Sequence, residues 1–563
     1  MLGRLLRDLL ASGRPERLIA LGERAFDAGD YPGAADHLSR ALTRIPADDK
    51  RRTPLELRLA ISLQECKRVP EAEKLLRAML ERDANLSGAL IQLAMLHFMA
   101  GDAKDARRLM DRYVARHADA GSRLKRALML PVILESNEQV DRLRKQLERD
   151  LDQLATERVK PLAHPEGEVL LTQFYLAYHA RNNRNLFRKL CRTIRAHYHT
   201  RTEIGRRLFA HGAKLRVGFV SSFFHSHSVG RTTHGLIRDL PRDRFDVHVF
   251  AITPHNDAMA HTIRASADRY ATLPGDVDRA REAIEAAQLD ILVFADIGMH
   301  PVTTFLAFWR MAPLQLTTWG HSVTSGVDTI DHYVSSDAIE PPNAQELYSE
   351  KLLRMPGYFL PRYERPAPAR AAAAGGNHVY FCPQSLFKLH PDFDRALKGI
   401  LDRDAKGEAL LLGGNPRWEE AIRARLARTL GDAVRRVRFM PPASHAAFLG
   451  QIAAADVIID PFHFGGCNTS CEALALGVPV VTLPSFQLPG RFTMGLYREM
   501  GIDACIAQSE EDFVARAVRF ATEPDHRRAV SAQILERAPA LFDRPDTGRI
   551  LGDELLRLAE SRR

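Results

Sequence analysis

The most telling segment of this chain is Asp460-Pro-Phe-His-Phe-Gly-Gly-Cys-Asn-Thr-Ser-Cys-Glu-Ala-Leu-Ala-Leu-Gly477. It follows Asp456-Val-Ile-Ile-Asp460, which is typical of a buried strand, and it continues as a glycine-bearing loop and a helix start. Such a loop points backbone N–H groups and the positive end of a helix at an anion. Glu472, one turn into the helix, is placed to accept hydrogen bonds from sugar hydroxyls. The segment therefore predicts a nucleotide-sugar site; an ordinary strand–loop–helix with a glycine turn is the alternative.

Strand-like segments alternate with helical ones on both sides of this loop. The earlier series is 215–222, 245–251, 290–296 and 314–319, and the later one is 379–382, 409–412, 437–440, 456–460 and 480–483. This alternation is typical of parallel sheets covered by helices on both faces, which bind ligands at the carboxyl ends of their strands. The Ala/Pro/Gly-rich run 366–376 reads as a linker. We therefore predict two domains, 213–365 and 377–563, facing a cleft, with a helix closing the second.

The first 120 residues carry a helical repeat. Small residues recur at Ala34, Ala72 and Ala106, which lie 38 and 34 residues apart, and Gly29-Asp30 and Gly101-Asp102 supply turn signals. A period near 34 residues resembles tetratricopeptide repeats, whose stacked helix pairs form a concave binding surface, here for peptides. A plain helical bundle is the alternative. We predict repeats over 1–120 and a helical connector over 121–212, including helices at 173–179 and 186–191.

Composition narrows the class of protein. The 563 residues are 45% hydrophobic and 26% charged, ordinary for a globular protein, and no apolar run nears the ~18 residues of a membrane helix. The amphipathic segment 1–10 is no signal core, so we expect a cytoplasmic protein with six reduced cysteines. A net charge of +9 favours phosphorylated ligands, but no aromatic-basic module predicts nucleic-acid binding.

The other common phosphate-binding loops are absent from the sequence. No G-x-x-x-x-G-K-[ST] occurs, and no G-x-G-x-x-G follows a predicted strand.

Four groups of loop residues follow predicted strands in a fixed order. They are 221–234, 296–301 with 310–326, 383–388 and 467–472. In this order, behind the helical repeats, they resemble the protein O-GlcNAc transferase family, glycosyltransferase family 41. The resemblance implies a GT-B fold, in which two Rossmann-like domains face a cleft and the second mainly holds the donor. It also implies inversion at the anomeric carbon, a UDP-sugar as co-substrate, no cofactor and no required metal.

The resemblance assigns the diphosphate to the second domain. Lys388 matches the lysine that binds the donor diphosphate, where a compact ammonium suits a leaving group that gains negative charge. Thr469 matches a threonine of the phosphate-binding helix start, to which Ser470 also belongs. Cys467 and Asn468 stand where animal members carry histidine and threonine, so the detailed contacts of this cradle differ. For Lys388, a solvated lysine at a helix start is the alternative.

Three further residues are expected on the nucleoside side of the donor. Glu472 matches the acidic residue that grips the ribose hydroxyls. Gln384 is expected to contact the uridine side. His445, which precedes an apolar helical stretch, is expected to cap a helix or to approach the base.

The first domain supplies the candidate catalytic residues. His227 matches the histidine near the reacting centre, where it either handles a proton or orients acceptor or donor; His225 is the competing candidate. Asp296 is a second possible acid, base or orienting group, and His321, on a glycine-bounded loop, is expected to line the cleft. Two histidines two residues apart also suit a metal, but no third ligand is evident.

The substrate remains open between two branches of the family. The segments 225–234 and 296–306 look more like bacterial adhesin N-glucosyltransferases, whereas the repeats favour the O-GlcNAc branch. We expect transfer of GlcNAc from a UDP-sugar to Ser or Thr of a protein bound by the repeats and cleft. Transfer of glucose to Asn is the alternative, followed by a UDP-sugar epimerase or an inactive repeat scaffold. The sequence leaves the oligomeric state undetermined.

Overall fold

The computed structural model describes residues 14–204, 214–357, 364–366, 376–542 and 544–562. The segment 1–10 and most of the 366–376 run, interpreted above as amphipathic and as a linker, lie outside these residues. The chain forms two compact units, Met1–Pro131 and Val132–Arg563. Within the described part of the chain, no helix is both long and apolar enough to span a bilayer.

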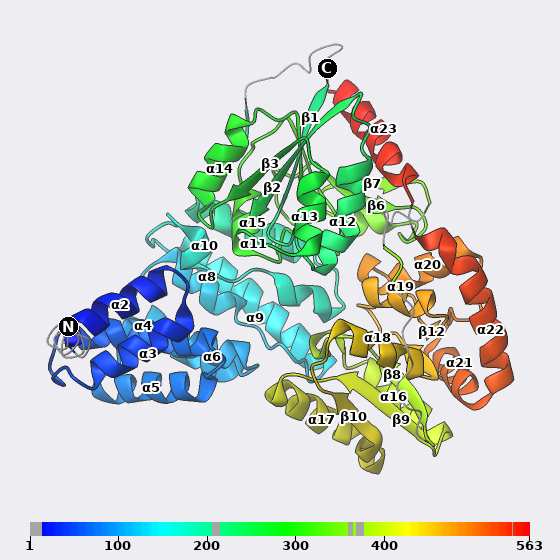
Figure 1. Ribbon diagram of the computed structural model, residues 1–563, viewed down its shortest axis with the longest axis horizontal. Helices are drawn as coiled ribbons and strands as arrows, with labels where there is room; N and C mark the ends of the chain where they lie inside the picture. Colours follow the sequence, from blue (N-terminus) through cyan, green and yellow to red (C-terminus); the bar gives the residue numbers. More distant parts are fainter. Residues whose placement is uncertain (1–13, 205–213, 358–363, 367–375, 543, 563) are drawn as a thin grey trace, which may run out of the picture. The chain divides into compact units, whose positions relative to one another are not determined.

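The first unit is built from consecutive helix pairs (Figure 1). Its helices are α2 (Pro15–Asp27), α3 (Tyr31–Leu42), α4 (Arg52–Glu65), α5 (Val69–Arg82), α6 (Ser87–Met99), α7 (Ala103–Val114) and α8 (Ala120–Leu128). Ala34, Ala72 and Ala106 are completely buried, one in the second helix of each pair. Small side chains there let neighbouring helices approach closely, as the predicted repeats require.

The turns inside the pairs explain the spacing of the repeat. Gly29 and Gly101 adopt left-handed φ values of 76° and 95°, which end a helix at little cost. Asp30 and Asp102 follow and cap the next helix, accepting hydrogen bonds from the backbone N–H groups of Gly33 and Asp105. The middle pair uses Lys67 at φ 62° and has no such cap.

The second unit opens with a connector made of α9 (Asn137–Thr156), α10 (Pro165–Glu168), η1 (Phe174–His179) and α11 (Arg184–His197). The predicted helix at 186–191 lies within α11, but the one at 173–179 is a short 3-10 helix. Ala180, at φ 51°, ends η1 in a left-handed turn. The run of aromatic residues therefore forms a compact buried turn and not an α-helix.

The first sheet is parallel, with strand order β3-β2-β1-β4-β5-β6-β7. Its strands are β1 (Leu215–Ser221), β2 (Phe245–Ile252), β3 (Arg269–Leu273), β4 (Ile291–Phe294), β5 (Leu314–Thr317), β6 (His332–Ser336) and β7 (Lys351–Met355). The four predicted strands are β1, β2, β4 and β5. The pattern missed three strands. The edge strands β3 and β7 are partly exposed, and β6 is buried although it carries histidine and serines.

Helices flank this sheet (Figure 1). They are α12 (Ser228–Asp239), α13 (Ala258–Ala265), α14 (Val277–Ala286) and α15 (Pro301–Leu306). The last helix of the chain, α23 (Asp546–Glu560), also packs on this first domain. Gly548 lies against Asp239 at the end of α12, and Gly552 lies against Phe245. The chain therefore returns to its first sheet after completing the second.

The second sheet is also parallel, with order β10-β9-β8-β11-β12. Its strands are β8 (His378–Cys382), β9 (Gly407–Leu412), β10 (Val437–Met440), β11 (Val457–Ile459) and β12 (Val480–Val481). Its helices are α16 (Phe393–Arg403), α17 (Pro416–Leu430), α18 (His445–Ala454), α19 (Asn468–Ala475), α20 (Phe492–Met500), α21 (Glu510–Thr522) and α22 (Pro524–Arg537). All five predicted strands are present, so two Rossmann-like domains follow a helical region as expected.

Candidate functional site

The loop between β11 and α19 is held in shape by a buried carboxylate. Asp460 Oδ1 accepts a 2.7 Å hydrogen bond from the Gly466 backbone N–H, and Oδ2 accepts from the hydroxyls of Thr482 and Thr493 at 3.0 and 2.7 Å. A Cβ on Gly465 would lie 2.5 Å from Asp460 Oδ2. Burial raises the pKa of Asp460, while these hydrogen bonds oppose the rise. The glycines thus let the chain wrap closely around one carboxylate.

This loop leaves the start of α19 without a side-chain cap. Cys467 occupies the N-cap position and makes no capping hydrogen bond. Thr469 Oγ1 accepts a short hydrogen bond from Gln384 Nε2, and Ser470 Oγ lies 2.8 Å from Thr493 Oγ1. Asn468 Oδ1 is buried without a partner. The N–H groups at the start of a helix attract anions, so this turn is suited to a phosphate.

Lys388 faces the same region from the loop after β8, where it ends the short helix η3 (Leu386–Lys388). Its Nζ donates a 2.8 Å hydrogen bond to Gln384 Oε1 and lies 5.0 Å from the centre of the Phe464 ring. No described carboxylate forms an ion pair with it. Desolvation by burial lowers the pKa of Lys388 to about 8, although Asp460 favours the charged form. A desolvated ammonium without a paired carboxylate is a strong candidate for binding an anion.

A cavity of about 250 Å³ lies where the two sheets and the connector meet. Its walls include Phe174, Tyr178, His227, Met299, Trp319, His321, Gln384, Phe387, Lys388, Phe464, Cys467, Asn468 and Thr469. Seven predicted site residues therefore share one cavity. Phe174 and Tyr178 were not predicted, because nothing local in the sequence indicates that the connector reaches the cleft. Phe464, in the loop between β11 and α19, was not singled out either.

His227 is the N-cap residue of helix α12 and lines this cavity. Its Nδ1 accepts a 3.2 Å hydrogen bond from the Val229 backbone N–H, and its ring stacks on Phe223 at 4.4 Å. Burial lowers the pKa of His227 to about 4, so the ring is neutral near pH 7. Because Nδ1 acts as an acceptor, the single proton of the neutral ring is on Nε2. This arrangement favours His227 as a hydrogen-bond donor and not as a base through Nε2.

His225 does not share the cavity with His227. Its ring stacks on His255 at 3.9 Å, and its Nδ1 lies 3.8 Å from Asp257 Oδ2. Among the described side chains, no three-ligand group includes either His225 or His227. The two histidines therefore occupy different environments, although only Ser226 separates them.

Asp296 and His321 are both predicted site residues of the first domain, but only His321 lines the cavity. Asp296 is fully buried outside the cavity walls; its Oδ2 accepts a 2.9 Å bond from Thr303 Oγ1 and its Oδ1 has no partner. Burial raises the pKa of Asp296 to about 7. His321 lines the cavity, stacks on Phe174 at 5.7 Å, and has a pKa lowered by burial to about 4.

Glu472 and His445 lie in a second cavity of about 370 Å³. Glu472 Oε1 accepts hydrogen bonds from His445 Nε2 at 2.8 Å and from Arg231 Nη1 at 3.2 Å. Arg231 belongs to α12, so this ion pair links the two domains. Ser444, and not His445, caps α18, since its Oγ accepts from the Ala447 N–H. Arg231 is a site candidate that the sequence interpretation did not single out.

Most of the chain, including the loops that line these cavities, matches a known protein family. The family model for glycosyl transferase family 41 matches residues 135–364 and 373–544. The chain belongs to glycosyl transferase family 41. This confirms the resemblance drawn from the four groups of loop residues, which all fall inside the matched ranges.

Several curated proteins are similar to this family 41 chain. A tomato (Solanum lycopersicum) protein described as a probable UDP-N-acetylglucosamine–peptide N-acetylglucosaminyltransferase SPINDLY is 25% identical over 324 residues, covering 55% of this chain. A UDP-glucose:protein N-beta-glucosyltransferase of Actinobacillus pleuropneumoniae is 25% identical over 341 residues, covering 57% of this chain and 53% of its own length. The match spans only about a third of the tomato protein.

A solved structure shares the fold of this family 41 chain. A mutant of the Thermobaculum terrenum O-GlcNAc transferase superposes with a TM-score of 0.71 at 21% sequence identity, covering 97% of this chain and 98% of that one. The helical region followed by two Rossmann-like domains is therefore a GT-B arrangement like that structure, as predicted.

Proposed function

We propose that this protein is an inverting glycosyltransferase that moves GlcNAc from UDP-GlcNAc to a Ser or Thr hydroxyl of a protein. The observation that carries the proposal is the Lys388 ammonium, which has no carboxylate ion-pair partner among the described residues and lies in one cavity with the uncapped start of α19. Together they offer a positive charge and backbone N–H groups to a diphosphate. The family and its peptide-modifying relatives support a protein as acceptor.

The transfer uses this cavity as a site for the leaving group. A bond forms between the acceptor oxygen and the anomeric carbon while the bond from that carbon to the diphosphate oxygen breaks. The electron pair leaves with UDP, whose growing charge Lys388 and the start of α19 stabilise, and the acceptor proton passes to solvent. His227 donates a hydrogen bond from Nε2 and orients the reactants. Glu472 and His445 receive the nucleoside in the neighbouring cavity.

Two further parts of the proposal concern the polypeptide and the alternative sugar. The helical repeats of the first unit bind the acceptor polypeptide, since stacked helix pairs present an extended concave surface.

Transfer of glucose to Asn is a second candidate, favoured by the similarity to the A. pleuropneumoniae N-glucosyltransferase. Both candidates use the same diphosphate site, so they differ only at the sugar and the acceptor atom.

A donor screen tests the proposal. Purified protein is incubated with host lysate and radiolabelled UDP-GlcNAc, UDP-glucose or a GDP-sugar, and label in protein is counted. Label from UDP-GlcNAc that mild alkali releases supports O-linked transfer, whereas alkali-resistant label from UDP-glucose supports transfer to Asn. A new sugar formed from the donor alone identifies an epimerase. Absence of UDP binding in calorimetry contradicts the proposed site and leaves an inactive scaffold.

A further inference from the structure

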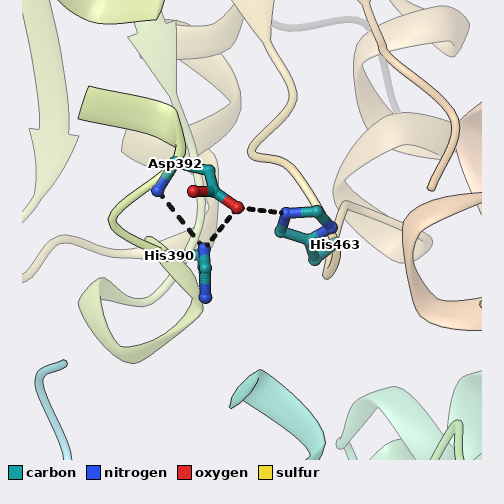
Figure 2. A group of neighbouring side chains, drawn as sticks. All are labelled: His390, Asp392 and His463. Atoms are coloured by element: carbon teal, nitrogen blue, oxygen red, sulfur yellow. Dashed lines mark hydrogen bonds and ion pairs between the residues drawn. The ribbon is translucent and has the colours of Figure 1, made fainter. Parts of the chain in front are cut away.

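Outside the cavity walls, three side chains join the two loops of the proposed diphosphate site. We call His390, Asp392 and His463 the His–Asp–His cluster. Figure 2 shows the Asp392 carboxylate between the two imidazole rings. Its Oδ2 lies 3.1 Å from His390 Nδ1 and 2.9 Å from His463 Nε2. His390 and Asp392 follow Lys388 in the chain, whereas His463 lies between β11 and α19, so one carboxylate ties both loops together.

The Asp392 side chain joins the two loops and does not cap its own helix, α16. It stands at the N-cap of α16, where an aspartate usually accepts a hydrogen bond from the helix, yet it makes no such bond. Its other oxygen, Oδ1, accepts a 2.8 Å hydrogen bond from Asn137 Nδ2 at the start of α9. The hydrogen bond from His390 holds the pKa of Asp392 well below its usual range. The carboxylate is therefore ionised and committed to joining three segments.

His463 has an unusual backbone conformation that the cluster explains. Its φ is 69°, in the left-handed region that residues other than glycine seldom adopt. The turn directs Phe462 into the core against Phe393, at 5.3 Å, and places the Phe464 ring 5.0 Å from Lys388 Nζ. The ring of His463 is held at both nitrogens, by Asp392 and by Ser485 Oγ at 2.9 Å. Such backbone strain persists only where the surroundings determine it.

Two imidazoles and a carboxylate also form a ligand set that zinc accepts. Here, however, both contacts of Asp392 Oδ2 are ordinary hydrogen-bond lengths. Arg395 Nη1 already lies 3.9 Å from Asp392 Oδ1, and the charge of Arg181 acts on His390. A metal ion would be repelled by these guanidinium groups, which weighs against a metal site.

We propose that the His–Asp–His cluster positions the donor site: it holds the Phe464 turn and the Lys388 loop together, so that the ammonium faces the start of α19. This inference rests on the proposed function. The three residues do not line the cavity proposed for the diphosphate and act through Lys388 and Phe464, so they are positioning residues. Their loss should impair the handling of the UDP part of the donor more than recognition of the acceptor.

The most informative variant is His463→Gly. Glycine adopts a φ of 69° without strain, so the change removes both ring hydrogen bonds without forcing the backbone to move. We expect UDP affinity and kcat to fall about tenfold or more, because small misplacements of catalytic groups cost one to two orders of magnitude. The KM for the acceptor should stay unchanged. Asp392→Asn, which removes the shared acceptor atom, should behave alike.

A matched control is Gln288→Gly, which also replaces a left-handed residue, at φ 54°, by glycine. Gln288 lies in the turn before β4 and contacts neither loop, so its variant should bind UDP like the wild type. Wild-type UDP affinity and kcat in His463→Gly would overturn the proposal. Binding of one equivalent of Zn²⁺ to the wild type, lost in Asp392→Asn, would also overturn it in favour of a metal site.

A measurement that needs no nucleotide separates this inference from the proposed function. The amides of Gly465 and Gly466 are hydrogen-bonded to Pro489 O and Asp460 Oδ1. In His463→Gly, hydrogen exchange over residues 461–467 should accelerate, while Gln288→Gly leaves it unchanged. If the wild type fails to bind UDP, the proposed function fails. Faster hydrogen exchange in His463→Gly would still support the inference that the His–Asp–His cluster holds the two loops together. Unchanged hydrogen exchange in His463→Gly would overturn that inference.

Discussion

Lys388 is buried, and its ammonium group contacts a neutral amide and an aromatic ring but forms no ion pair with a described carboxylate. Its protonation is therefore sensitive to what occupies the cavity. Its pKa is lowered to about 8 by burial, from an ordinary value near 10.5. The unfolded chain therefore binds more protons than the folded one between these pH values, and the contribution of Lys388 to folding stability rises as pH increases through that window. Anion binding has the opposite dependence, because only the ammonium attracts a diphosphate.

The first prediction concerns this pH dependence. UDP affinity of the wild-type protein should weaken between pH 7 and 9, approaching a tenfold loss for each pH unit above the pKa of Lys388. Lys388→Met should bind UDP weakly at every pH and should lack measurable transfer. Calorimetric titrations with UDP at several pH values test this. An affinity that stays constant to pH 9 would contradict the role of Lys388.

The second prediction concerns Glu472, whose buried carboxylate is held by Arg231 and His445. If it receives the ribose, the wild type should bind UDP about tenfold more tightly than 2′,3′-dideoxy-UDP, since a hydrogen bond to a charged group contributes roughly 1.5–3 kcal/mol. In Glu472→Ala the two nucleotides should bind alike. Competition calorimetry measures both affinities. A preference for UDP that survives in Glu472→Ala would remove Glu472 from the ribose site.

At the scale of elements, helix starts organise both sides of the cavity. The start of α19 has no side-chain cap, which leaves its N–H groups for an anion. The start of α12 is capped by His227, which engages one ring nitrogen and determines which nitrogen carries the proton. One helix start thus offers its backbone to a ligand, whereas the other uses a side chain that also lines the cavity.

The third prediction separates the two roles of His227. Asparagine is a good N-cap residue, so His227→Asn should keep the stability of the wild type, whereas His227→Ala should lose about 1 kcal/mol. Both variants lack Nε2 and should lose most of their transfer activity. Melting curves and initial rates test this. Near-normal rates in His227→Asn would show that only the cap matters.

For the whole molecule, the order of packing differs from the order along the chain. The last helix, α23, returns to the first sheet and buries Leu551 and Leu555 there. Arg231 and Glu472 connect the domains across 241 positions of sequence. The described second unit is therefore held together by contacts between segments that are remote in the chain.

The fourth prediction tests where α23 packs. Leu555 is fully buried, so Leu555→Ala should cost about 2–5 kcal/mol of folding stability. Hydrogen exchange should accelerate in α12, and not in α19, because α23 contacts the first domain. Leu535→Ala, at a side chain that is 45% exposed on α22, is the control and should change little. Faster exchange confined to α19 would contradict this packing.

Local patterns in the chain were sufficient to predict the helical repeats, nine of the twelve strands, and the loop at 460–477. The repeats are marked by small residues 34 to 38 positions apart, the strands by runs of apolar residues, and the loop by glycines between a strand and a helix start. The same local logic placed Lys388, Thr469 and Asn468 at the ends of strands of one sheet, where they do share a cavity.

Tertiary structure alone decided the contacts that complete the site. Asp296 is fully buried and does not line the cavity, whereas His227 does, and Glu472 is held by an arginine from the other domain. Phe174 and Tyr178 reach the cleft from the connector, and α23 covers the first sheet. These features depend on burial and on pairs of residues far apart in sequence, and no periodicity or spacing along the chain encodes which distant surfaces meet.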